Sequence, residues 1–167
     1  MGAIPSLAIA RGGFAKPVNR HLFSGIPALG EEYRHELVHV ALLPLNSGDN
    51  LMSLFASEGV ATWLGGTTGG DYRAAVRGLA DYLAANPSAT LDALMESTSP
   101  PQAARYAASA VLCAMVSDAG GTAALKEFLV AGPGTADIRA ALQRSLGKPW
   151  AAIFADWRSR VAQVAAR

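Results

Sequence analysis

The sequence predicts an α+β domain that is mostly helical, with a small strand region at its N-terminal end. Before residue 31, short apolar pieces alternate with Gly and Pro, which is typical of short strands. From residue 31 on, segments of helical length are separated by prolines, glycine pairs and turn residues. The chain has 167 residues, 51% of them hydrophobic, which suits one packed core. We expect a single domain in which residues 1–30 form a strand-rich edge, 31–64 a helix pair and 71–167 a helical lobe.

The first expected helix covers residues 31–43, because acidic residues at its start suit the helix dipole and Pro44 ends it. The second covers about 51–64 and ends at Gly65 and Gly66, where a Gly-rich loop begins. Further helices are expected over residues 72–85, 91–96, 101–119, 122–130, 136–146 and 149–165. The last of these carries an apolar stripe that indicates a core-facing helix or, alternatively, a docking face: Trp150, Phe154, Trp157 and Val161.

Composition narrows the partners of the chain. Lys and Arg number 14 against 13 Asp and Glu, so the formal net charge is +1 and we expect no nucleic acid and no polybasic membrane contact. The uncharged run over residues 106–117 is too short to span a bilayer, so we expect no transmembrane segment. The single cysteine, Cys113, excludes an internal disulfide, and its Ala and Val neighbours indicate an inert core residue.

His35, Glu36 and His39 form an HExxH motif inside the first expected helix. Residues four apart leave a helix on the same face, about 6 Å apart along its axis, so both imidazoles can reach one zinc ion. Glu36 lies about 100° further round the helix, where it can take a proton from a water held at the metal. The alternative is a solvated helix face that carries two histidines by chance.

A catalytic zinc ion usually has three protein ligands, so a third is required. The remaining histidine, His21, is expected on a strand or at the surface, and Leu45 stands where a third histidine of the metzincin pattern would be. Glu58 is the better candidate, because it falls on the apolar face expected for the second helix and a buried carboxylate needs compensation. Its alternative is a partly exposed or Arg-paired glutamate. That face consists of Leu51, Leu54, Phe55, Ala61 and Leu64.

The segment HELVH at 35–39, followed by SEGVA at 57–61, resembles the gluzincin zinc metallopeptidases, and in particular the bacterial peptidase MA family. The signature of gluzincins is HExxH with a glutamate on a following helix, and eighteen residues separate His39 from Glu58 here. Tyr106, the stretch 121–125 and Trp150 are similar to features of the helical half of those domains. The resemblance covers roughly residues 30–160 and implies a zincin-like (gluzincin) fold.

The resemblance implies that His35, His39 and Glu58 bind Zn²⁺, that Glu36 is the general base, and that the substrate is a peptide or protein. The tetrahedral oxyanion of such a reaction needs a further donor, for which gluzincins often use Tyr or His. Tyr106 is the candidate, since it shares a helical stripe with Ala110, Cys113 and Ala114 and so faces inward. A packing role for Tyr106 is the alternative. Tyr72, beside the Gly-rich loop, is the second choice.

Two departures from the family matter. No segment matches the G-x-M-E-N pattern that holds a substrate's free amine in the aminopeptidase branch, so exopeptidase action on N-termini is not supported. Only thirty-four residues precede His35, so we expect either a minimal strand lobe or a chain truncated at its N-terminus, with residues 12–16 as an edge strand able to pair with substrate. Because residues 1–5 carry no basic region and Arg11 interrupts the apolar stretch, we expect no signal peptide here, while the family resemblance favours an exported bacterial protein.

Two rivals to the peptidase hypothesis stay open. One is a non-catalytic zincin-fold binding module within a larger exported protein, against which the retained Glu36 weighs. The other is a helical interaction domain with an accidental HExxH motif, which predicts that neither His35→Ala nor Glu58→Ala changes the metal content. Sequence alone leaves the cleavage preference and the oligomeric state open.

Overall fold

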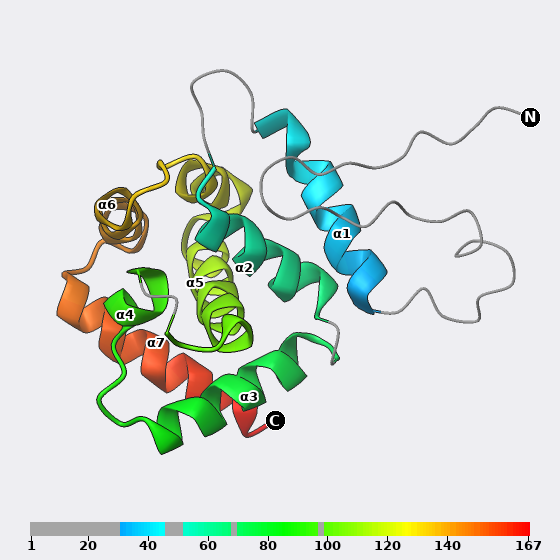
Figure 1. Ribbon diagram of the computed structural model, residues 1–167. Helices are drawn as coiled ribbons and strands as arrows, with labels where there is room; N and C mark the ends of the chain where they lie inside the picture. The colour runs from blue at the N-terminus through cyan, green and yellow to red at the C-terminus, as the bar shows by residue number, and fades with distance from the viewer. Residues whose placement is uncertain (1–30, 46–51, 68–69, 97–98) are drawn as a thin grey trace, which may run out of the picture.

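The computed structural model describes residues 31–45, 52–67, 70–96 and 99–167, and this part of the chain is an all-helical domain without strands (Figure 1). The predicted strand region at 1–30, with His21 and residues 12–16, lies outside the described residues. The seven helices, in chain order, are α1 (Glu31–Leu42), α2 (Leu54–Gly65), α3 (Tyr72–Ala85), α4 (Leu91–Glu96), α5 (Gln102–Leu129), α6 (Thr135–Leu146) and α7 (Trp150–Ala165).

Most helix bounds agree with the prediction because their end signals are local. The predicted helices at 72–85 and 91–96 match α3 and α4 residue for residue. Helix α2 begins three residues later than expected, because Ser53 caps it and its side chain accepts from the Ala56 amide. Helix α1 ends at Leu42, and Pro44 lies in a short 3₁₀ turn, η2 (Leu43–Leu45). The predicted helices at 101–119 and 122–130 correspond to the two parts of α5, which are separated by non-helical dihedral angles at Gly120 and Gly121.

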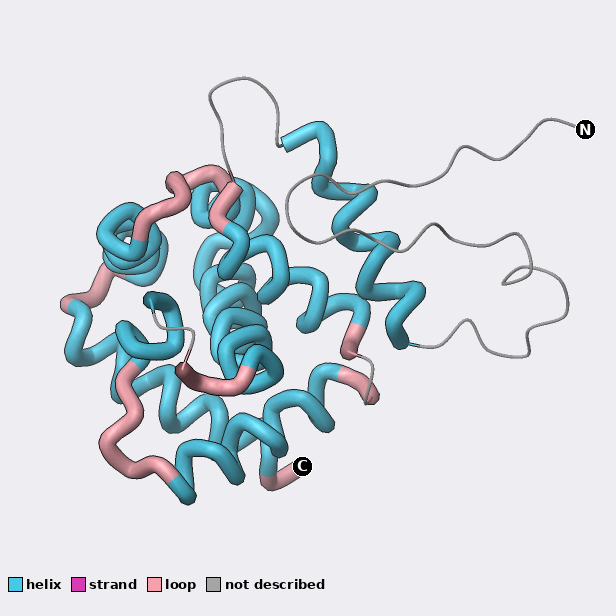
Figure 2. Tube along the Cα trace, in the orientation of Figure 1, coloured by secondary structure: helices cyan, strands magenta, loops and turns pink. Residues whose placement is uncertain are grey.

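Helix α5 is the centre of the fold, and α2, α3, α6 and α7 pack around it (Figures 1 and 2). Small residues line most of its buried surface, so neighbouring helices approach closely. Gly59 of α2 meets Ser109 of α5, where an added Cβ would lie 2.8 Å from the Ser109 carbonyl carbon. Trp157 of α7 is fully buried, and its Nε1 donates to the Ala108 carbonyl at 3.1 Å. Val161 is buried as well, and Trp150 and Phe154 are partly buried and pack against the core, so the predicted core-facing stripe of α7 is confirmed.

By length and composition, α5 is the one helix among the described residues that could cross a membrane. The core helix of a globular protein meets the same criteria, and α5 is packed against α2, α3 and α6 here. The expected absence of a transmembrane segment stays a prediction.

The apolar face predicted for α2 was wrong in two of its members. Leu54 and Leu64 are 60% and 58% exposed, whereas Phe55 and Ala61 are buried. Helix α2 packs between α1 and α5, so most of its residues are buried and only a few side chains are exposed to solvent. Glu58 is buried for this reason, and not because it belongs to a leucine stripe.

Candidate metal centre

The three predicted metal ligands lie together where α1 crosses α2. The Nε2 atoms of His35 and His39 are 3.2 Å apart. Glu58 Oε2 lies 3.1 Å from the His35 Nε2 atom and 3.5 Å from that of His39. The side chains of His35 and Glu58 are only 12% and 11% exposed, and His39 is buried. Two imidazole nitrogens and one carboxylate oxygen therefore converge on one partly buried point.

These separations fit a tetrahedral zinc site. Ligand atoms about 2.05 Å from a tetrahedral ion lie roughly 3.3 Å from each other. The three observed distances, 3.1, 3.2 and 3.5 Å, bracket that value. Two neutral imidazoles and one carboxylate are also a donor set that suits zinc, with a fourth position left for a water or a substrate oxygen. The residues present could therefore hold the ion that the sequence motif implies.

The other nitrogen of each imidazole has a partner that fixes the ring. His35 Nδ1 donates to the Gly66 carbonyl at 2.8 Å, so in the neutral ring the Nε2 lone pair points at the candidate site. His39 Nδ1 lies 3.1 Å from Ser57 Oγ, a hydroxyl that can accept its proton. Such outer partners orient metal-binding imidazoles and fix their tautomers. The sequence analysis missed both Ser57 and Gly66.

Electrostatics link the three side chains even without a metal. Burial would lower the pKa of His35, but hydrogen bonds to Glu58 and Gly66 outweigh it and the pKa is raised above 6.5. Burial would raise the pKa of Glu58, but the hydrogen bonds from both imidazoles lower it to about 2. A proton on His35 can therefore compensate the buried carboxylate when no cation is present.

Glu36 lies on α1 and is partly buried. Its carboxylate is close enough to His35 to help raise the pKa of that imidazole, after the larger effects of burial, Glu58 and Gly66. The negative charge of Glu36 thus acts at the same site as the three ligand atoms.

Tyr106 of α5 lies against the candidate site, as its role in the prediction requires. Its ring stacks on that of His35 with centroids 6.5 Å apart and planes 19° apart. Gln102 Nε2 donates to the Tyr106 hydroxyl oxygen at 2.6 Å, so the hydroxyl proton is left for another acceptor, and the Glu58 carboxylate is one acceptor that interacts with it. Burial, with a smaller effect from the Glu58 carboxylate, raises the pKa of Tyr106, so the phenol stays protonated at neutral pH.

Tyr72, the second choice, is in a different environment. Burial raises its pKa to about 12, and Arg160 and Asp118 are the charged residues that act on it most strongly. None of the three candidate ligands acts on it. Cys113 is fully buried, its thiol donates to the Ala56 carbonyl at 3.8 Å, and burial raises its pKa to about 12. The predicted core position of Cys113 is confirmed, and its inertness stays a prediction.

Comparison of the chain with protein-family models, with curated proteins and with solved structures gave no match. The resemblance to gluzincins therefore stays a prediction from the motif.

Proposed function

We propose that this protein is a zinc-dependent metallopeptidase that hydrolyses peptide bonds in a peptide or protein substrate. The observation that carries the proposal is the convergence of His35 Nε2, His39 Nε2 and Glu58 Oε2 at mutual distances of 3.1–3.5 Å, next to Glu36 of the same helix. We also propose that the domain has a zincin-like (gluzincin) fold, in which α1 and α2 are the zinc-binding helix pair. The protein would be exported from the cell.

Zinc, when bound, polarises a carbonyl and lowers the pKa of a coordinated water to about 7. Glu36 accepts the proton of the attacking water on its carboxylate. As the C–N bond breaks, Glu36 returns that proton to the leaving amine. His35 and His39 contribute by holding their Nε2 lone pairs toward one point, which the bonds at their Nδ1 atoms secure.

Tyr106 fits the role of the second donor to the carbonyl oxygen. Its hydroxyl proton is not used by Gln102, which is the donor in their contact. A neutral phenol next to the site can hydrogen-bond an oxygen on which negative charge develops. Loss of one such donor typically lowers kcat by about 10²–10³, so Tyr106→Phe is expected to have that effect.

The experiment that tests the proposed function is Glu36→Gln, assayed for both zinc content and cleavage of unfolded protein substrates. The variant is expected to keep about one zinc per chain and to lose at least about 10³ in kcat/KM, because the amide cannot accept a proton. Glu127→Gln, on an exposed part of α5, is the matched control and should match the wild type. Zinc binding without any turnover in the wild type would refute hydrolysis and favour the non-catalytic binding module.

A further inference from the structure

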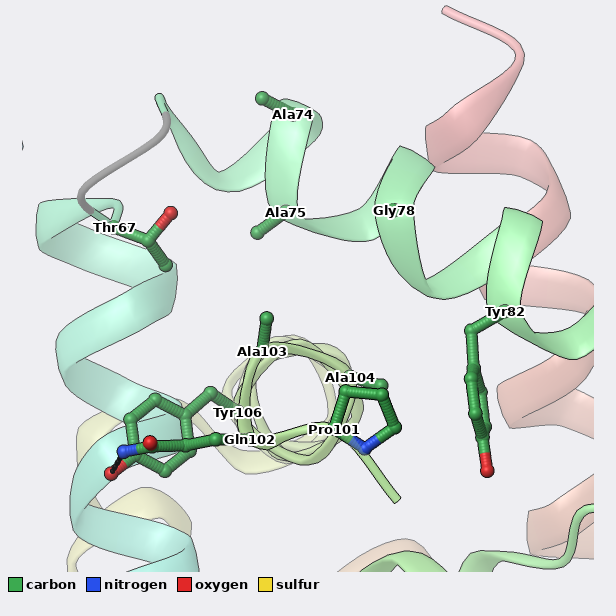
Figure 3. Close-up of a pocket in the computed structure, with 10 residues that line it drawn as sticks. All are labelled: Thr67, Ala74, Ala75, Gly78, Tyr82, Pro101, Gln102, Ala103, Ala104 and Tyr106. Carbon is green, nitrogen blue, oxygen red and sulfur yellow. Dashed lines mark hydrogen bonds between the residues drawn. The ribbon is translucent and has the colours of Figure 1, made fainter.

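A pocket of about 660 Å³ opens between α3 and the first turns of α5 (Figure 3). Ala75, Gly78 and Tyr82 form its α3 side, while Gln102, Ala103 and Tyr106 form its α5 side. Figure 3 shows Tyr106 and Gln102 at one end, Tyr82 at the other, and Ala103 between them. The volume lies within the range of small-molecule and peptide side-chain sites.

The chemistry of this pocket is uncharged. None of the described residues that line it is Asp, Glu, Lys, Arg or His, and most are Ala, Gly, Pro or Tyr. Small side chains on both walls create the space, since a larger residue at Gly78 or Ala103 would project into it. A cation or an anion placed there would find no counter-ion among the lining residues, whereas an apolar group would cover apolar surface on both walls.

Tyr106 connects this pocket to the candidate metal centre. Its ring is part of the pocket wall and also stacks on His35, with 6.5 Å between the ring centroids. Residues of an extended peptide follow one another at about 3.3 Å. A substrate whose scissile carbonyl lies at the metal centre therefore brings a residue one or two positions away to the mouth of the pocket.

We propose that this pocket is the specificity subsite for a large apolar or aromatic side chain, such as Leu or Phe, close to the scissile bond. The inference rests on the proposed function for the position of that bond. Contact of such a side chain with both walls removes more apolar surface from water than alanine does, and we expect a preference of at least about tenfold over alanine. Lysine at the same position is disfavoured relative to Phe, because no acid lines the pocket to pair with its ammonium group.

The test fills the pocket from each wall. An added Cβ at Gly78 meets nothing within 4 Å, and Ala103 is exposed, so both variants, Gly78→Leu and Ala103→Leu, should fold. Gly78→Leu should have a melting temperature at or above that of the wild type, and Ala103→Leu one close to it. Ala84→Leu adds the same side chain to an exposed position of α3 outside the pocket and is the control.

The substrates are blocked, alanine-rich heptapeptides with Phe, Ala or Lys at the central position, and cleavage is followed by mass spectrometry. Wild type and Ala84→Leu should cleave the Phe peptide at least about tenfold faster than the Ala peptide, in kcat/KM, and the Lys peptide slowest. In both filling variants the Phe to Ala ratio should fall to within about twofold of one.

Binding is measured in parallel on zinc-loaded Glu36→Gln, with and without Gly78→Leu, by calorimetry with the same peptides. If the peptides are cleaved but both filling variants keep the wild-type ratio of kcat/KM for the Phe and Ala peptides, the pocket is not the specificity subsite. The proposed hydrolysis would then still hold. If the wild type cleaves no peptide but Gly78→Leu weakens binding of the Phe peptide by at least about tenfold, the pocket is supported as a binding site and the proposed hydrolysis is refuted. Equal affinity for the Phe and Lys peptides would overturn the pocket in either case.

Discussion

At the residue scale, Glu58 is the side chain of the candidate site that contacts both histidines. It is buried, with both imidazoles within 3.5 Å of its Oε2 atom. A buried carboxylate needs a compensating charge, and here either a proton on His35 or a metal ion can supply it. Protons and zinc therefore compete for the same Nε2 lone pair.

The stability of the metal-free protein should depend on pH through this pair. The pKa of Glu58 is lowered from 4.5 to about 2, so its contribution is present above pH 4.5 and is lost as the pH falls towards 2. The pKa of His35 is raised above 6.5, so its contribution is present below pH 6.5 and is lost as the pH rises through the folded-state value. The pair should therefore stabilise the fold most between about pH 4.5 and 6.5.

Urea denaturation in the presence of a chelator measures this dependence. The difference in unfolding free energy between wild type and Glu58→Gln should be largest in that window and shrink on both sides of it. A difference that does not vary between pH 3 and pH 8 would contradict the assigned pKa directions.

Ser57→Ala tests the outer partner of His39. The variant removes the hydroxyl 3.1 Å from His39 Nδ1, so the ring loses the group that orients it. Loss of such a partner typically weakens metal binding by about 10–100-fold, and zinc competition titration should show a decrease of that size. Ser159→Ala, exposed on α7, is the control. Equal zinc affinity in the two variants would show that Ser57 does not position His39.

The convergence of the candidate ligands was predictable in part, because HExxH places His35 and His39 on one helix face. Glu58 was identified from its expected helix face and from the resemblance to gluzincins, and only the face expected for it was partly wrong. The outer partners were not predicted. Ser57 directly precedes Glu58, which is a usable signal, since a helix that brings one residue to a site brings its neighbour close as well. Gly66 takes part through its carbonyl, which every residue type has, so no sequence signal could have identified it.

At the element scale, the crossing of α1 and α2 decides whether the ligands meet. An added Cβ at Gly65 would lie 2.5 Å from the His35 amide nitrogen and 2.6 Å from the Arg34 carbonyl carbon. Both are backbone atoms, so α1 would have to move by about 0.9 Å before ordinary contact at 3.4 Å is reached. Zinc sites tolerate deviations of only about 0.2 Å in ligand distance.

Gly65→Ala is therefore expected to weaken zinc binding by at least about tenfold and to destabilise the fold by about 1–3 kcal/mol. Zinc competition and urea denaturation measure the two effects. Gly78→Ala is the matched control, because its Cβ meets nothing within 4 Å, and it should stabilise the fold by up to about 1 kcal/mol through helix propensity. Unchanged zinc affinity in Gly65→Ala would contradict the described crossing.

Helix ends were predictable from local signals, whereas helix faces were not always so. The break at Gly120 and Gly121 and the end of α2 at its glycine pair follow from residues at those positions. Leu54 and Leu64 are exposed because α1 and α5 cover other sides of α2. The apolar pattern of one helix does not indicate which neighbouring helices will cover it.

At the scale of the whole molecule, α1 is an outlying helix. Among the described helices, α2 is its main packing partner, whereas the others surround α5 (Figure 1). Two of the three candidate ligands lie on α1 and the third on α2. A metal ion there would connect the outlying helix to the core, so binding and local stability should be linked.

Hydrogen exchange should show this linkage. Zinc at 100 times its Kd stabilises the bound state by about 2.7 kcal/mol, and we expect added protection to concentrate in α1 and α2. Helices α6 and α7 serve as the internal control and should change little if they already exchange only by global unfolding. If zinc slows hydrogen exchange elsewhere but not in α1, the result would contradict a site shared by α1 and α2.

The order of the helices followed from the sequence, but the pocket beside Tyr106 did not. Its walls come from α3 and α5, and its volume depends on how far these helices stand apart at Ala75 and Ala103. Small residues at those positions allow either close packing of the two helices or a pocket between them, and the sequence does not distinguish these two arrangements. The strand-rich edge predicted for residues 1–30 stays a prediction.

The zinc content of tag-free protein, measured by elemental analysis on wild type, Glu58→Ala and Glu96→Ala, tests the central claim most directly. Wild type and Glu96→Ala, whose glutamate is exposed on α4, should each hold about one zinc per chain. Glu58→Ala should hold far less after the same dialysis, because one of three protein ligands is lost. Zinc content that is zero in all three proteins, even after incubation with zinc, or equal in Glu58→Ala and wild type, would contradict the His35, His39 and Glu58 site.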